Sequence, residues 1–167
     1  MDEQTKQHIE QRIREHEHDG NQAMQIKYDR IFNTPQVSTH LRPATIGTAA
    51  GNNDDYVIVP ITGIFAGVDF SAVDALATSD TNFITWTITN LGQAGAGSTA
   101  LLAAGNGNTT KTTGGSAIAA NTKRALSITT VVGADQVAAG DRLRIRAAVT
   151  GTLANTVAYP AYILRFT

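Results

Sequence analysis

The sequence predicts an all-β domain that follows a short, charged, helical N-terminal arm. Twelve of the 27 charged residues and three of the four histidines lie within residues 1–33. The rest of the chain is rich in Gly, Ala, Thr, Asn, Val and Ile, arranged as about eight short apolar runs between turn residues. Such runs at regular spacing are typical of a β-sandwich, a jelly roll or a small barrel. We expect the arm to span residues 1–40 and the β domain to span 44–167.

Length and composition exclude several classes of function. Charged residues make up 16% of the 167-residue chain, where about a quarter is usual, and this favours a surface covered by partners in an oligomer. The net charge of −1 gives no electrostatic case for binding nucleic acid or an anionic membrane. The absence of cysteine removes disulfides and thiolate chemistry. Without a signal peptide or an apolar run of ~20 residues, we expect folding in a cytoplasm.

The arm is expected to be helical over residues 4–17. Gln, Lys, Glu and Arg are good helix formers, Ile9 and Ile13 share one face, and Gly20 ends the run. A helix of this length is marginal alone, so its isoleucine stripe must dock onto three-fold copies of itself or onto a groove of a larger partner. A second apolar cluster, read as an extended clamp, comprises Met24, Ile26, Tyr28, Ile31 and Phe32. Thr34-Pro35 ends that cluster, because a residue before proline avoids the helical region.

The β domain contains six clear strand candidates and two weaker ones. The clear runs are 56–60, 61–68, 82–90, 124–132, 142–150 and 157–166, and the weaker ones are 98–103 and 117–119. Within 82–90, Ile84, Trp86 and Ile88 alternate with Phe and Thr, so they predict the buried face. Gly63 and Gly67 predict a bend or bulge. Residues 92–116 are biased to Gly, Ala, Thr and Asn and predict long exposed loops.

The pair His16 and His18 is a candidate metal site. Residues two apart point the same way in an extended chain, so three chains along a three-fold axis would present their imidazoles to one ion. Imidazole suits iron, nickel, copper and zinc. The alternative is a helix end, where histidines favour the negative end of the dipole. An axial transition metal is therefore expected only for the extended trimer, and no other cofactor is expected.

Arg142, Arg144 and Arg146 form a row on one face of the strand 142–150. With Lys123 and Arg124, this row could bind an anion or a carbohydrate. The alternative, which we prefer, is a solvated sheet face or a set of salt bridges between subunits. The acidic partners expected for such bridges are Asp69, Asp74 and Asp80.

Other conspicuous residues have structural explanations. Trp86 and Tyr56 are candidates for stacking on sugars, but Trp86 shares its strand face with two isoleucines and is expected in the core. Asp54-Asp55 could bind calcium through oxygen ligands, but without the required ligand spacing we expect a turn. The chain has no GxSxG, GxxxxGK[ST], HExxH or GxGxxG motif. All four histidines precede residue 41, so we expect no catalytic residues and no enzyme.

Two stretches resemble proteins of tailed-bacteriophage particles. HEHDG at residues 16–20, followed by Ile26, is similar to the HxHDG segment near the start of many phage fibre and virion proteins. In trimeric phage fibres HxH pairs can hold an axial metal, which implies that role for His16 and His18. NFITWTITNLG at 82–92, AAGDRL at 138–143 and TGT at 150–152 are similar to jelly-roll modules displayed on phage capsids and fibres. The resemblance implies an antiparallel jelly-roll-like β-sandwich.

These observations lead to three functional hypotheses. The first is a capsid decoration or head-fibre protein on the virion surface, a homotrimer whose arm binds the major capsid protein or another virion protein. Its expected contact residues are Ile9, Ile13, Met24, Ile26, Tyr28, Ile31 and Phe32. The second is a tail-fibre or receptor-binding tip whose loops at 92–116 contact host glycans, although tail fibres usually carry long shafts. The third is a carbohydrate-active enzyme, which the absence of a paired-carboxylate signature disfavours.

Overall fold

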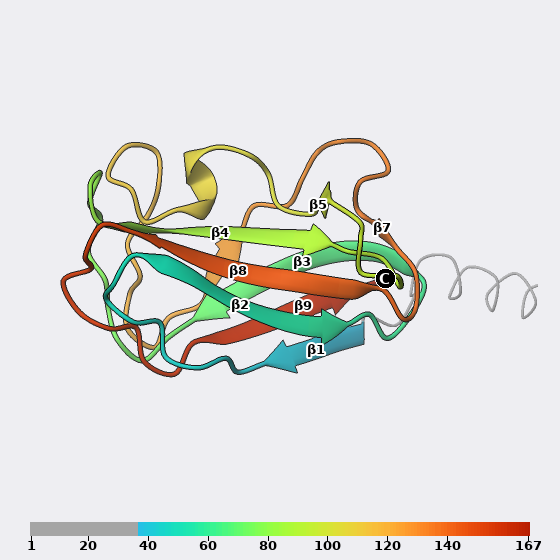
Figure 1. Cartoon of the computed structure of the whole chain (residues 1–167), viewed down its shortest axis with the longest axis horizontal. Coiled ribbons are helices and arrows are strands. Elements are labelled where there is room, and N and C mark those ends of the chain that lie inside the picture. The colour runs from blue at the N-terminus through green and yellow to red at the C-terminus, as the bar shows by residue number, and fades with distance from the viewer. Residues whose placement is uncertain (1–36) are drawn as a thin grey trace, which may run out of the picture. The chain divides into compact units, whose positions relative to one another are not determined.

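The computed structural model describes residues 37–167 (Figure 1). The chain divides into two units between Pro35 and Gln36. The predicted helix, the histidine pair and the apolar residues of the arm therefore lie outside the described residues. These predictions stay untested.

Two antiparallel sheets pack against each other in the described unit (Figure 1). The first sheet has the strand order β1-β9-β3-β6, with the short strand β7 paired to the start of β3, and the second has the order β2-β8-β4-β5. The strands are β1 (Val37–Leu41), β2 (Gly51–Ile58), β3 (Gly63–Ser71), β4 (Phe83–Asn90), β5 (Thr99–Ala100), β6 (Arg124–Leu126), β7 (Gln136–Val137), β8 (Arg142–Thr150) and β9 (Ala161–Phe166). A single 3-10 turn, Asn106–Asn108, lies between β5 and β6.

The connectivity is that of a jelly roll. Strand β1 pairs with β9, β2 with β8, β3 with β6, and β4 with β5, so the pairs nest inside one another along the chain. Successive pairs alternate between the two sheets, as in a long antiparallel ribbon that has been rolled up. This is the double Greek-key arrangement of an eight-stranded jelly roll, with β7 as an addition. The predicted fold class is confirmed.

The core lies between the sheets and follows the predicted alternation. On β4 the buried side chains are Ile84, Trp86 and Ile88. On β8 they are Leu143, Ile145, Ala147 and Val149. Trp86 packs on Phe70 and donates its indole N–H to the Tyr162 hydroxyl at 3.1 Å. Burying aromatic side chains contributes a few kcal/mol each, and the shared hydrogen bond removes the cost of burying both polar atoms.

The predicted bulge lies at Gly67. The register between β3 and β9 shifts between Phe65 and Gly67. A Cβ atom at position 67 would lie 2.8 Å from Nη2 of Arg165, so glycine leaves the room that this guanidinium needs. Arg165 in turn pairs with Asp69, a nearly buried carboxylate that Lys123 also approaches at 3.3 Å.

Several stretches differ from the sequence-based assignment, and one of them is the expected strand 117–119, which forms only an isolated bridge at Ile118. Val37–Leu41, placed in the arm, is the edge strand β1 of the jelly roll. Asp54-Asp55, expected to form a turn, belongs to the first half of β2, because partners on β8 satisfy its backbone. The expected strand 124–132 ends at Leu126, apart from a single bridge at Ile128. Gln136–Val137, which lies outside the expected strands, forms β7. In each case partners distant in sequence decide the outcome.

The stretch 92–116 is less exposed than predicted. Leu101, Leu102, Asn108, Thr109 and Thr110 are buried within it. Asn108 donates its amide to the carbonyls of Ala103 and Ser127 and accepts from the Ser127 N–H, which ties the loops together. The polar residues of 92–116 therefore include buried ones that form hydrogen bonds within the domain.

Two of the motifs that carry the resemblance meet in a buried contact. Asn90, from NFITWTITNLG, donates to Asp141 of AAGDRL at 2.8 Å, and both side chains are less than 10% exposed. Asn90 also accepts from the Gly92 N–H, and Asp141 from the Ala138 N–H. The two motifs thus stabilise the turns that join β4 and β8 to their neighbours.

Candidate binding sites

The arginine row lies on the outer face of β8, opposite residues of β2. The register pairs Arg146 with Asp54, Arg144 with Tyr56, and Arg142 with Ile58. Arg146 donates two hydrogen bonds of 2.6 Å to the Asp54 carboxylate. The hydrogen bond from Arg146 holds the pKa of Asp54 below its usual range. The acidic partner that the row finds within the chain is therefore Asp54 of the neighbouring strand, which pairs with Arg146.

The two other arginines of the row differ in their surroundings. The Arg142 guanidinium lies 4.1 Å from the centroid of the Tyr56 ring, a cation–π contact that occupies one face of that ring. Arg144 borders a shallow groove of about 340 Å³, where Thr87 and Thr89 are among the lining residues. Its Nε atom is buried and has no hydrogen-bond partner among the described residues. Arg144 is therefore the member of the row whose guanidinium is not fully hydrogen-bonded within the described residues.

Lys123 and Arg124 do not join the row, so the larger predicted cluster is not assembled within the chain. Lys123 pairs with Asp69. Arg124 donates to the carbonyls of three loop residues and lies over the Trp86 ring, and its burial lowers the pKa of its guanidinium. Arg124 therefore has a structural role, because it links β6 to these loops.

The acidic partners expected for the row are engaged elsewhere in the chain. Asp69 pairs with Arg165, Asp74 accepts from the Ala158 N–H, and Asp80 accepts from the Thr113 N–H and hydroxyl. Hydrogen bonds from the Thr113 backbone and side chain lower the pKa of Asp80.

The Asp54-Asp55 pair is part of a strand, and the prediction of a turn is wrong. Adjacent strand residues point to opposite faces, so the two carboxylates cannot chelate one ion. Asp54 binds Arg146, whereas burial raises the pKa of Asp55. No group of three or more His, Asp or Glu side chains suited to a metal ion occurs within residues 37–167.

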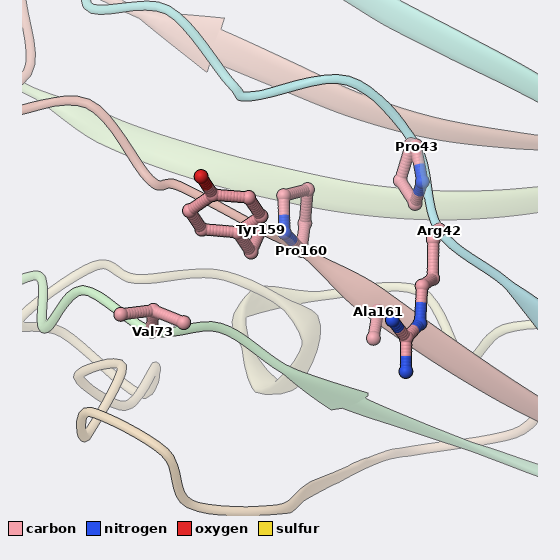
Figure 2. Close-up of a pocket in the computed structure, with 6 residues that line it drawn as sticks. All are labelled: Arg42, Pro43, Val73, Tyr159, Pro160 and Ala161. Carbon is pink, nitrogen blue, oxygen red and sulfur yellow. The ribbon is translucent and has the colours of Figure 1, made fainter.

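A second groove lies at the start of β9, and sequence reasoning missed it. Its volume is about 500 Å³, and it is lined by Arg42, Pro43, Val73, Tyr159, Pro160 and Ala161. Pro160 and Ala161 lie between Tyr159 on one side and Pro43 with Arg42 on the other (Figure 2). We call this feature the Tyr159 groove.

The backbone at Tyr159 is unusual. Its φ of 49° lies in the left-handed region, which a bulky residue rarely adopts, and the following proline restricts it further. Its side chain is 77% exposed. By contrast, Asn121 has a similar φ of 53°, and asparagine tolerates that conformation. In the sequence the only signal is the pair Tyr159-Pro160, which lies within the expected strand 157–166 and gives no indication of a groove.

Comparisons with known proteins identify no relative. No protein-family model, curated protein or solved structure matches the sequence. Within the part of the chain that the structure describes, no helix is long and apolar enough to cross a membrane.

Proposed function

We propose that the chain is a structural protein of a tailed-bacteriophage particle, either a capsid decoration protein or a head fibre. The segment before the jelly roll would attach it to the major capsid protein or another virion protein, and the jelly roll would be displayed as a trimer. The support from the sequence is the resemblance of HEHDG and of the three β-domain motifs to virion proteins, together with the concentration of charge in residues 1–33.

The observation that carries the proposal is that the preceding segment joins the jelly roll at one end and the Tyr159 groove lies at the other end. The preceding segment joins it at Val37, beside Phe166, whereas Arg42 follows the other end of the same strand. The residues that line the Tyr159 groove follow β1 or β3, or precede or begin β9, so the groove lies at the end of these strands away from the junction. A domain attached at one end and carrying a groove at the other suits attachment and display.

Exposed apolar side chains near the junction suit the attachment role. Ile64 of β3 is exposed and precedes Phe65, which pairs with Phe166. Phe166 in turn pairs with Val37, where the preceding segment joins the domain. The turn that leads into β7 exposes Val131 and Val132, the latter completely. Neighbouring exposed apolar residues of this kind often mark contacts with other proteins.

Particles that lack the protein provide the main test. A decoration protein that bridges capsid subunits stabilises the assembled state, by about 2.7 kcal/mol per site at a hundredfold excess over its dissociation constant. Such particles should then release DNA at a lower temperature and adsorb normally to the host. A head fibre that only displays its domain would leave both properties nearly unchanged. Electron microscopy should locate the chain on the head in either case.

The alternative is a tail-fibre or receptor-binding tip protein that recognises host glycans. Removing a tip protein should leave particle stability unchanged and abolish adsorption. Locating the chain on the tail would replace the first proposal by this one. Mass measurement of the purified protein tests the trimer separately, and a stable monomer both in solution and on the particle would contradict it.

A further inference from the structure

We propose that the Tyr159 groove binds a saccharide that carries a carboxylate group. The tyrosine ring would stack on the apolar C–H face of a sugar ring, and the Arg42 guanidinium would bind the carboxylate. The proposal concerns the jelly roll alone and does not depend on where in a particle the chain is placed.

The first support is the strained and exposed tyrosine. A non-glycine residue at positive φ is costly in free energy and keeps that conformation only where its surroundings impose it, and such residues cluster at ligand sites. Here the chain is fixed on both sides of Tyr159, since Val157 pairs with Ile46 before it and Ala161 pairs with Ser71 after it. Val157 exchanges two backbone hydrogen bonds with Ile46, and the Ala158 N–H donates to Asp74 at 3.0 Å. The structure thus presents an aromatic ring to solvent at a conformational cost.

The second support is the rigidity and composition of the groove. Two of its six lining residues are prolines, whose rings have little freedom to lose on binding. Pro160 is buried, so the floor of the groove is anchored to the domain. A preformed groove of a few hundred cubic ångströms with apolar walls and few polar groups is typical of a small-ligand site.

The third support is an arginine that has no acidic partner within residues 37–167. Among residues 37–167, no carboxylate pairs with Arg42, whereas Arg146 and Arg165 each bind an aspartate. Guanidinium groups bind carboxylates through two parallel hydrogen bonds. Arg42 can therefore supply the charge that an acidic ligand requires.

Together these groups favour an acidic sugar over a neutral sugar. An exposed aromatic ring suits the C–H face of a pyranose, and Arg42, the one cation that lines the groove among the described residues, favours a ligand with a negative group at that position. The groove is open to solvent, so the remaining hydroxyl groups of a sugar would stay hydrated. Such a site binds weakly, with dissociation constants in the millimolar range, and gains strength from several copies on one particle.

The test uses the full chain and two matched pairs of probes. We would titrate 3′-sialyllactose against lactose, and trigalacturonic acid against its methyl ester, by saturation-transfer NMR. At least one acidic probe should bind, and its neutral partner should bind about tenfold more weakly or not at all. Added salt should weaken the binding of the acidic probe.

Variants locate the binding site. Tyr159→Ala should weaken binding of the acidic probe about tenfold, and Tyr159→Phe should retain it. Arg42→Gln should remove the preference for the acidic probe over its neutral partner. Tyr56→Ala, at an exposed ring on the other sheet, and Asn121→Gly, at the other non-glycine residue with positive φ, are controls that should bind normally.

Three results would overturn the proposal. They are the absence of binding by both acidic probes up to about 10 mM, equal binding of acidic and neutral partners, and unchanged binding in Tyr159→Ala or Arg42→Gln. Circular dichroism of each variant excludes loss of the fold as the cause of lost binding.

Discussion

The arginine row on β8 and the Tyr159 groove differ in how far the chain satisfies their polar and charged groups. In the row, Arg146 pairs with Asp54 and Arg142 lies over Tyr56, so two of three cations have partners within the chain. In the groove, Arg42 has no acidic partner among the described residues, and Tyr159 is exposed in a strained conformation. The row is conspicuous in the sequence, whereas the groove is not.

This comparison indicates that a cluster of charge is a weak sign of binding when neighbouring strands supply its partners. A paired surface charge already has most of the interaction it can make. A group left unpaired, or held under strain, retains free energy that a ligand can release. We therefore expect variants of paired residues to change stability, and variants of the groove to change binding.

The largest effect is expected for Asp69→Asn, which breaks the most buried of the paired sets. Burial raises the pKa of Asp69, but hydrogen bonds from Arg165 and Lys123 outweigh this effect and bring the pKa below its usual value. Asparagine cannot neutralise Arg165, so we expect the free energy of unfolding to fall by about 2 kcal/mol. Urea unfolding measures this, with Asp135→Asn as a control, because Asp135 makes no ion pair within the described residues. A loss equal to that of the control would contradict the assignment.

The next largest effect is a gain of stability in Tyr159→Gly. Glycine adopts positive φ without strain, so removing the tyrosine should raise the free energy of unfolding by about 1 kcal/mol while binding is lost. Asn121→Gly should give a smaller gain, because asparagine already tolerates this conformation. Thermal unfolding of the two variants provides the comparison. A destabilised Tyr159→Gly would mean that the tyrosine is held by packing rather than kept under strain.

Adjacent carboxylates on β2 should give opposite changes. Asp54→Asn should lower the free energy of unfolding at pH 7 by about 0.5 kcal/mol, because the pair with Arg146 is partly exposed. Asp55→Asn should raise it, because burial penalises the Asp55 carboxylate. Changes of the same sign in both variants would contradict this assignment of the two faces.

The pH dependence follows from the same shifts. The pKa of Asp54 is lowered in the folded state, so its contribution is present above the ordinary value of 3.8 and is lost as the pH falls through the folded value. The pKa of Asp55 is raised, so the penalty it imposes at neutral pH disappears as the pH falls through its folded value. Unfolding measured between neutral pH and about pH 2 should show that Asp54→Asn loses less stability on acidification than the wild type.

The smallest change in stability is expected for Arg42→Gln. Its side chain is exposed and has no acidic partner among the described residues, so the free energy of unfolding should stay within about 0.5 kcal/mol of the wild type. Arg146→Gln is the matched control, since the same substitution there breaks an ion pair. An equal loss in both variants would show that Arg42 has a structural partner.

The sequence by itself determined the fold class, because strand periodicity is a local property. The alternation in β4 and β8 predicted which side chains are buried, and glycine positions predicted the bulge at Gly67 and several turns. It also separated a charged segment from the β domain. It could not assign Val37–Leu41 or Gly51–Asp55, whose pairing depends on strands about a hundred residues away.

Only the tertiary structure decided which polar residues are satisfied. Asp54 meets Arg146 through strand register, Arg124 is tied to loop carbonyls, and Asn108 joins loops that the composition suggested were exposed. The Tyr159 groove likewise combines the end of β1, the end of β3 and the start of β9. Each arrangement depends on contacts between distant segments, and local sequence patterns carry no information about which distant residues become neighbours.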